Sequence, residues 1–271
     1  MISPRLTVTA CAAIASVGIV IDSLEMLGSR WSLEANFDWV VLEAGHPALI
    51  KHPRLASVVT ALTTNSGLTS LLVARVSGAP LAALMFMVDL SGAVVLCLLV
   101  TLSSALLRLR LTYGLDGADQ MQAVVWGGLT LYGIATVPWI RELALGFIAA
   151  QLLLSYLTAG LAKVMSLQWR DGRAITGILS TQLHGNRILL RYIGRRPYSI
   201  VLAWGVILFE IVGPAAAVMS MIGVLVVCVL AVFFHLGIAF AMRLNGFVWA
   251  FLSALPPLIY TIQLIHERPL W

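Results

Sequence analysis

The chain has 271 residues, of which 60% are hydrophobic and only 11% are charged, and its mean hydropathy is +0.97. Soluble proteins carry roughly 25% charged residues, so this composition excludes an ordinary soluble domain and indicates an integral membrane protein. The net charge of +5 comes mainly from loops beside apolar runs, which favours membrane orientation and lipid contact and argues against nucleic acid as a partner.

Apolar runs of about 20 residues, the length that crosses a bilayer, recur along the chain. We expect an all-α polytopic transmembrane bundle with interfacial helices, forming one domain over residues 1–271 with no separate soluble domain. The first run holds Asp22 and Glu25 and no small-residue cleavage site follows it, which favours a helix over a cleaved signal peptide. The seven expected spans lie near 6–27, 80–106, 121–139, 143–164, 199–219, 222–242 and 245–264.

Residues 55–78 are ambiguous, because polar residues and a glycine interrupt their apolar run at 63–67. An interfacial or a re-entrant segment fits this pattern. With seven spans, most arginines fall on one side, which the positive-inside rule makes cytoplasmic in a multi-pass protein of the cell inner membrane. Arg75 then belongs to a long first loop on the opposite side. An eighth span within 55–78 would invert part of this arrangement.

Two carboxylates fall within expected spans, Asp89 near the middle of the second and Glu210 in the fifth. Buried carboxylates must be protonated, paired or near water. Either could pair with Lys163 or with an arginine as part of the architecture. Together they could instead form the proton route of a transporter, although the sequence lacks the repeated halves and matched broken helices that many transporters carry.

The segment G-L-D-G-A-D-Q at 114–120 precedes an apolar helix expected from Met121. Asp116 and Asp119 are three residues apart, a weak pattern for a metal site. An acidic first turn of a helix explains them better, because carboxylates stabilise helix N-termini. The sequence therefore predicts no metal site.

The most informative stretch is S-Y-L-T-A-G-L-A-K-V-M-S-L-Q-W-R-D-G, at 155–172. Helical spacing places Tyr156, Gly160 and Lys163 close to one stripe. Small residues on this stripe could leave room for a pocket, or could simply let two helices pack closely while Lys163 reaches the interface. A lysine where water is scarce needs a partner or a function.

The loop 165–198 holds apolar residues at mixed helical spacings among arginines. This pattern predicts an interfacial amphipathic helix, broken near Gly185, in contact with membrane lipids. Trp169 lies at the start of the loop, where tryptophan commonly anchors a protein at the membrane boundary.

His235 lies within the sixth span. An interhelical hydrogen bond would explain it as a packing element, and a proton relay is the functional alternative. No second histidine is central to an expected span, which argues against a haem site.

The motif Y-L-T-A-G-L-A-K followed by W-R-D-G resembles that of the vitamin-K-dependent γ-carboxylase family, whose membrane part is called the horizontally transferred transmembrane (HTTM) domain. Further segments are similar to the family in the same order, with short bacterial members as the nearest type. These segments are G-L-D-G-A-D-Q at 114–120, I-L-F-E at 207–210 and F-F-H-L-G-I-A-F-A-M-R-L-N-G-F at 233–247.

The resemblance implies that Lys163 is the base that deprotonates reduced vitamin K or another quinone, and that His235 bonds a quinone oxygen or relays protons. The quinone would lie against a set of nearby residues: Tyr156, Gly160, Trp169 and Glu210. The resemblance also implies lyase-type carboxylation of a peptide or small acidic substrate.

The chain departs from the eukaryotic carboxylases in lacking the large soluble region that holds their peptide substrate. An accessory subunit could supply that role. Short bacterial proteins that help to mature secreted peptide toxins are similar, so a non-catalytic membrane partner in peptide maturation or export is the second hypothesis. A proton-coupled transporter that uses Asp89 and Glu210 is the third.

Overall fold

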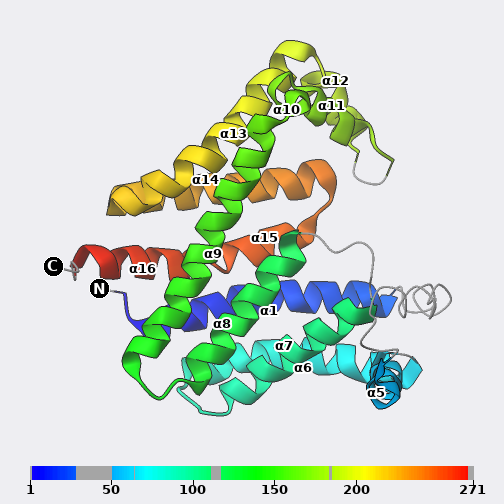
Figure 1. Cartoon of the computed structure of the whole chain (residues 1–271), viewed down its shortest axis with the longest axis vertical. Helices are drawn as coiled ribbons and strands as arrows, with labels where there is room; N and C mark the ends of the chain where they lie inside the picture. Colours follow the sequence, from blue (N-terminus) through cyan, green and yellow to red (C-terminus); the bar gives the residue numbers. More distant parts are fainter. Residues whose placement is uncertain (1, 29–50, 64, 111–116, 183–184, 268–271) are drawn as a thin grey trace. The chain divides into compact units, whose positions relative to one another are not determined.

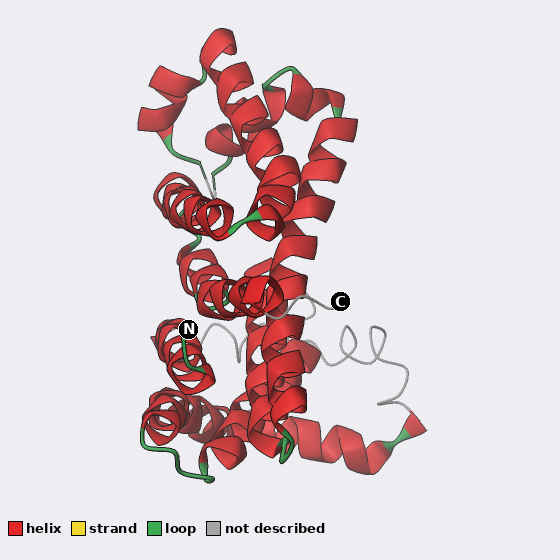
Figure 2. Cartoon of the chain, turned by 90° about the vertical axis from the view of Figure 1, so that its left-hand side faces the viewer, coloured by secondary structure: helices red, strands yellow, loops and turns green. Residues whose placement is uncertain are grey.

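The structure is a computed structural model that describes residues 2–28, 51–63, 65–110, 117–182 and 185–267. All regular elements in these ranges are helices, joined mostly by short loops (Figure 1, Figure 2). The expected all-α, multi-pass membrane bundle is thereby confirmed. Among the described residues, six helical segments are long and apolar enough to cross a membrane: Pro4–Gly28, Ser66–Met87, Pro138–Met165, Arg196–Met219, Met221–Met242 and Asn245–Glu267.

The chain divides into two compact units. The N-terminal unit comprises Pro4–Ala144, and the C-terminal unit comprises Leu145–Trp271 together with Met1–Ser3. Each unit is described by itself below. The expectation of one domain over the whole chain stays a prediction.

The N-terminal unit is built on four helices that pack in sequence. Helix α1 packs on α6, α6 on α7, α7 on α8, and α8 returns to α1, while α5 contacts α6 and α7 (Figure 1). The helices are α1 (Pro4–Gly28), α5 (Pro53–Thr63), α6 (Asn65–Met87), α7 (Ala93–Arg110) and α8 (Gly117–Ile134).

The expected single span over 80–106 is wrong. Helix α6 runs through Pro80, as transmembrane helices tolerate, and the chain turns instead at D-L-S-G, where Asp89 has φ 61°. Residues 55–78 form most of α5 and much of α6. Asp89 is therefore exposed in a turn and does not lie near the middle of a span.

A buried arginine crosslinks three helices of the N-terminal unit. Arg75 on α6 is only 3% exposed and donates to Asp22 Oδ2 at 2.9 Å, Ser23 Oγ at 3.1 Å and Ser104 Oγ at 2.8 Å. The placement of Arg75 in an external loop was wrong, because Arg75 lies within α6. Its three bonds tie α6 to α1 and α7, as expected for a buried charge, which needs partners.

The C-terminal unit holds the later part of α9 and all subsequent helices. Helix α14 packs on α13, α15 and α16, and the short helices α10 and α11 pack on α13 (Figure 1). The helices are α9 (Pro138–Met165), α10 (Leu167–Arg170), α11 (Arg173–Ser180), α12 (Arg187–Ile193), α13 (Arg196–Met219), α14 (Met221–Met242), α15 (Asn245–Leu252) and α16 (Leu255–Glu267).

Short helices form within 165–198, as its pattern predicted: Leu167–Arg170, Arg173–Ser180 and Arg187–Ile193. Helix α11 ends at Ser180 and α12 begins at Arg187, so the break near Gly185 is confirmed. The apolar faces of these helices meet α13 through a small core, which consists of Ile175, Leu179 and Ala203 with Trp169, Leu189, Leu190, Ile193 and Ala241 against them.

Candidate functional site

An ion pair between α9 and α13 forms the centre of the candidate site. Lys163 Nζ donates to both carboxylate oxygens of Glu210, each at 2.8 Å. The Glu210 side chain is only 4% exposed and that of Lys163 is 19% exposed. The lysine of the predicted motif thus has a specific partner, and the carboxylate is almost fully withdrawn from solvent.

Gly160 explains how the two helices come close enough for this pair. A Cβ atom at Gly160 would lie 2.8 Å from Ile211 Cγ1 and 2.9 Å from Glu210 Cβ, closer than carbon atoms pack. The absent side chain lets α9 cross α13 next to Glu210, one turn before Lys163. Of the two roles that its spacing allowed, pocket space or close helix packing, the structure shows close packing at Gly160.

The W-R-D-G part of the motif forms the turn that follows α9. The Trp169 ring lies beneath the lysine, with Lys163 Nζ 5.1 Å from its centroid, a cation–π distance. Gly172 has φ 78°, and a Cβ there would lie 2.6 Å from Ser199 Oγ and 2.7 Å from Ile200 N. Only glycine fits this left-handed position against the start of α13.

Asp171 closes the same turn. Its carboxylate accepts the backbone N–H of Arg173 at 3.1 Å and the Arg173 Nε at 2.6 Å. The hydrogen bond from the Arg173 backbone N–H lowers the pKa of Asp171 most, and the Arg173 guanidinium lowers it further. The pKa therefore lies below its ordinary value of 3.8. The charged carboxylate therefore helps to fix the link between α10 and α11.

A second polar pair lies on the same face of α9. Tyr156 Oη is 3.0 Å from His235 Nε2 on α14 in a hydrogen bond, and both residues are buried. With the phenol donating to Nε2, the neutral imidazole carries its proton on Nδ1. That atom is buried and has no hydrogen-bond partner among the described residues.

Aromatic rings surround this histidine. His235 stacks on Phe251 with ring centroids 4.3 Å apart, and Phe234 and Phe247 lie at 5.1 and 6.4 Å. Phe209 and Phe251 flank Tyr156 at 5.2 and 5.9 Å. These phenylalanines were not among the predicted site residues, because their ring contacts depend on which helices are neighbours.

The candidate residues thus form two groups rather than one. Lys163, Glu210, Gly160 and Trp169 make one group, and Tyr156 with His235 makes the other. Seven residues of α9 separate Lys163 from Tyr156, about 10 Å along the helix axis. The predicted catalytic roles of Lys163 and His235 stay predictions.

Comparison of the chain with protein-family models, with curated proteins and with solved structures finds no match. The resemblance to the carboxylase family therefore rests on the ordered motifs alone. What the two polar pairs do is a matter for proposal and experiment.

Among the other acidic candidates, Asp119 lies in the first turn of α8, as its spacing predicted. Asp116 lies outside the described residues. Asp89 lies in the exposed turn before α7. Within the transporter hypothesis, Asp89 therefore cannot serve as a buried proton carrier, which removes one of its two supports.

Proposed function

We propose that this membrane protein is an enzyme in which the Lys163–Glu210 pair takes a proton from the hydroxyl of a reduced quinone, as part of the modification of a peptide or small acidic substrate. The observation that carries the proposal is the twofold 2.8 Å contact between an ammonium group and a buried carboxylate. The motif resemblance at Tyr156–Lys163 and Trp169–Gly172 supports it.

The pair can hold an additional proton without creating an isolated buried charge. Glu210 as a carboxylate balances Lys163 as an ammonium, so the pair is neutral overall. A proton that arrives on Glu210 leaves the Lys163 ammonium to stabilise the negative oxygen that lost it, because opposite charges attract strongly where water is scarce. Lys163 is the exposed member, so an incoming hydroxyl would meet its N–H groups first.

The surroundings of His235 are aromatic. Four phenylalanines within the C-terminal unit pack around His235 and Tyr156, and His235 Nδ1 is a buried polar atom in need of a partner. A ligand oxygen would satisfy it. When bound, a reduced quinone would supply a weakly acidic hydroxyl and an electron-rich ring.

The test uses the two lysines of the chain, Lys163 and Lys51. Purified protein in detergent is mixed with reduced vitamin K in air, and bound quinone and its epoxide are measured by mass spectrometry. In this scheme Glu210 takes the proton and Lys163 stabilises the negative oxygen, and loss of such a stabilising donor lowers rates by about 10²–10³. We expect a loss of this size in Lys163→Ala and unchanged turnover in Lys51→Ala.

Glu210→Gln guards against a trivial loss of fold, because its amide still accepts a bond from Lys163. We expect this variant to bind the quinone and to lose most turnover. Binding no greater than the detergent background, or full turnover in Lys163→Ala, would refute the proposal.

A further inference from the structure

The positive charge of the chain is concentrated in one segment. Residues 166–199, here called the basic cap, contain six arginines and a single carboxylate, Asp171. Outside the cap, 11 basic residues balance 11 acidic ones. The whole formal excess of +5 therefore resides in the cap, and this uneven distribution calls for an anionic partner.

The position of the cap restricts what that partner can be. It follows Met165, the last residue of α9, and ends in the first turns of α13. Both helices are long and apolar enough to cross a membrane. The cap must therefore lie where these two spans leave the bilayer, at the level of the lipid headgroups.

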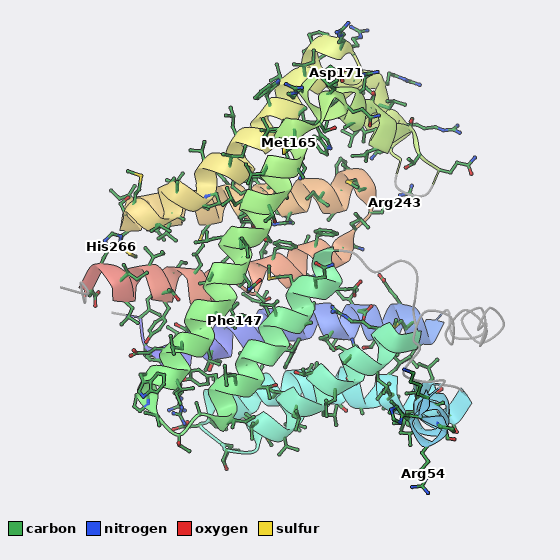
Figure 3. All side chains as sticks on the ribbon, viewed as in Figure 1. Arg54, Phe147, Met165, Asp171, Arg243 and His266 are labelled. Atoms are coloured by element: carbon green, nitrogen blue, oxygen red, sulfur yellow. The ribbon has the colours of Figure 1, made fainter. Side chains whose placement is uncertain are left out.

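The arginines of the cap face outward. All six are exposed, and nitrogen-tipped side chains project from this end of the C-terminal unit near the labelled Asp171 (Figure 3). The six are Arg170, Arg173, Arg187, Arg191, Arg195 and Arg196.

Helix α12 presents three distinct stripes. Arg187 and Arg191, one turn apart, form the first, and Ile188 and Tyr192 form the second beside it. Ile188 is 73% exposed and Tyr192 is 68% exposed, so neither side chain is covered by the bundle. The third stripe packs against the bundle and consists of Leu189, Leu190 and Ile193.

We propose that the basic cap binds anionic phospholipids, with Arg187 and Arg191 on headgroup phosphates and with Ile188 and Tyr192 among the upper acyl chains. A cationic stripe beside an apolar and aromatic stripe is the pattern of a helix that lies in the bilayer interface. A soluble polyanion would satisfy the arginines and leave Ile188 and Tyr192 in water. The bilayer surface satisfies both stripes at once.

The inference is independent of the proposed chemistry, since none of the four residues that it places on lipid belongs to the Lys163 or His235 groups. Its test uses the full chain in nanodiscs of phosphatidylcholine, with or without phosphatidylglycerol. Native mass spectrometry counts the phosphatidylglycerol retained on wild type and on Arg187→Gln/Arg191→Gln. Each surface cation contributes roughly 1 kcal/mol toward an anionic leaflet, so we expect the double variant to retain this lipid about thirty-fold more weakly.

The matched control is Lys51→Gln/Arg54→Gln, which removes the same charge from exposed positions of the N-terminal unit, where Figure 3 labels Arg54. We expect it to retain the lipid as wild type does. Ile188→Ser/Tyr192→Ser keeps every charge, and we expect it to weaken retention as well. High salt should release the lipid from wild type, because it screens exposed charges, and this measurement needs no variant.

Three outcomes would overturn the proposal. One is equal lipid retention by the cap and control variants, which would mean a diffuse charge effect. Another is displacement of the lipid by inorganic phosphate alone with no effect of the Ile188 and Tyr192 changes. The last is a soluble acidic peptide that binds the cap more tightly than the lipid does, which would assign the surface to a protein partner.

Discussion

Replacing Lys163 with methionine should destabilise the C-terminal unit far more than replacing Glu210 with glutamine. Methionine keeps the apolar stem of Lys163 and removes the charge, which leaves the 4%-exposed Glu210 carboxylate without its cation. Breaking a buried pair in this way costs about 3–5 kcal/mol. Glutamine at position 210 replaces the carboxylate with a neutral amide. The 19%-exposed Lys163 ammonium then still contacts the Trp169 ring and water. We expect about 1 kcal/mol for that change.

The double variant Lys163→Met/Glu210→Gln should be more stable than Lys163→Met alone. Its buried carboxylate has been removed together with the lysine, so no carboxylate is left without its cation. The loss of stability in the double variant should therefore be about 2–3 kcal/mol smaller than the sum of the two single losses, the upper range for residues in direct contact. Thermal unfolding followed by tryptophan fluorescence in detergent reports these differences. One kcal/mol corresponds to about 3 °C for a chain of this size.

The exposed pair between Arg173 and Asp171 is the control within the same unit. The Arg173 side chain is 68% exposed, so Arg173→Met should destabilise the unit by no more than about 1 kcal/mol. The unfolding midpoint should then fall by no more than about 3 °C. Additive effects of the Lys163 and Glu210 changes would refute the reasoning. So would equal losses from the two single variants.

Two further predictions concern the turn and the helix crossing. Gly160→Ala should cost about 1–3 kcal/mol, because its Cβ would overlap Glu210 and Ile211, whereas Gly205→Ala on α13 has open space and should be neutral or stabilising in the same thermal assay. The pKa of Asp171 is lowered in the folded state. Its contribution to the stability of the α10–α11 link is therefore present above pH 3.8 and is lost as the pH falls below that value. Hydrogen exchange, corrected for intrinsic rates, should show the α10–α11 amides opening in this acid range in wild type and at all pH values in Asp171→Asn. Protection that does not change with pH would contradict this account.

The sequence predicted well those features that depend on neighbours along the chain. Helix α9 follows from one uninterrupted apolar run, and the stripe of Tyr156, Gly160 and Lys163 follows from helical periodicity. The break between α11 and α12 follows from its glycine and asparagine. Each of these signals lies within a few residues of the feature that it specifies.

Other features depend on which helices meet, and local patterns do not contain that information. The partners of Lys163 and Tyr156 lie 47 and 79 residues further along. The span over 80–106 was misplaced because residues 55–78, whose apolar run is interrupted at 63–67, were not counted as part of a span. Arg75 was assigned to a loop for the same reason, although an arginine within L-L-V-A-R-V-S-G could have signalled a buried charge.

The location of the basic cap bears on how the protein is made. Its arginines emerge from the ribosome after the candidate spans Pro4–Gly28, Ser66–Met87 and Pro138–Met165 have been synthesised. Positive residues beside spans decide which way a membrane protein is threaded, and signals that arrive late can still reverse an earlier choice. The basic cap is therefore a strong topological signal that is read only after these spans, and it can still reverse the orientation that they took.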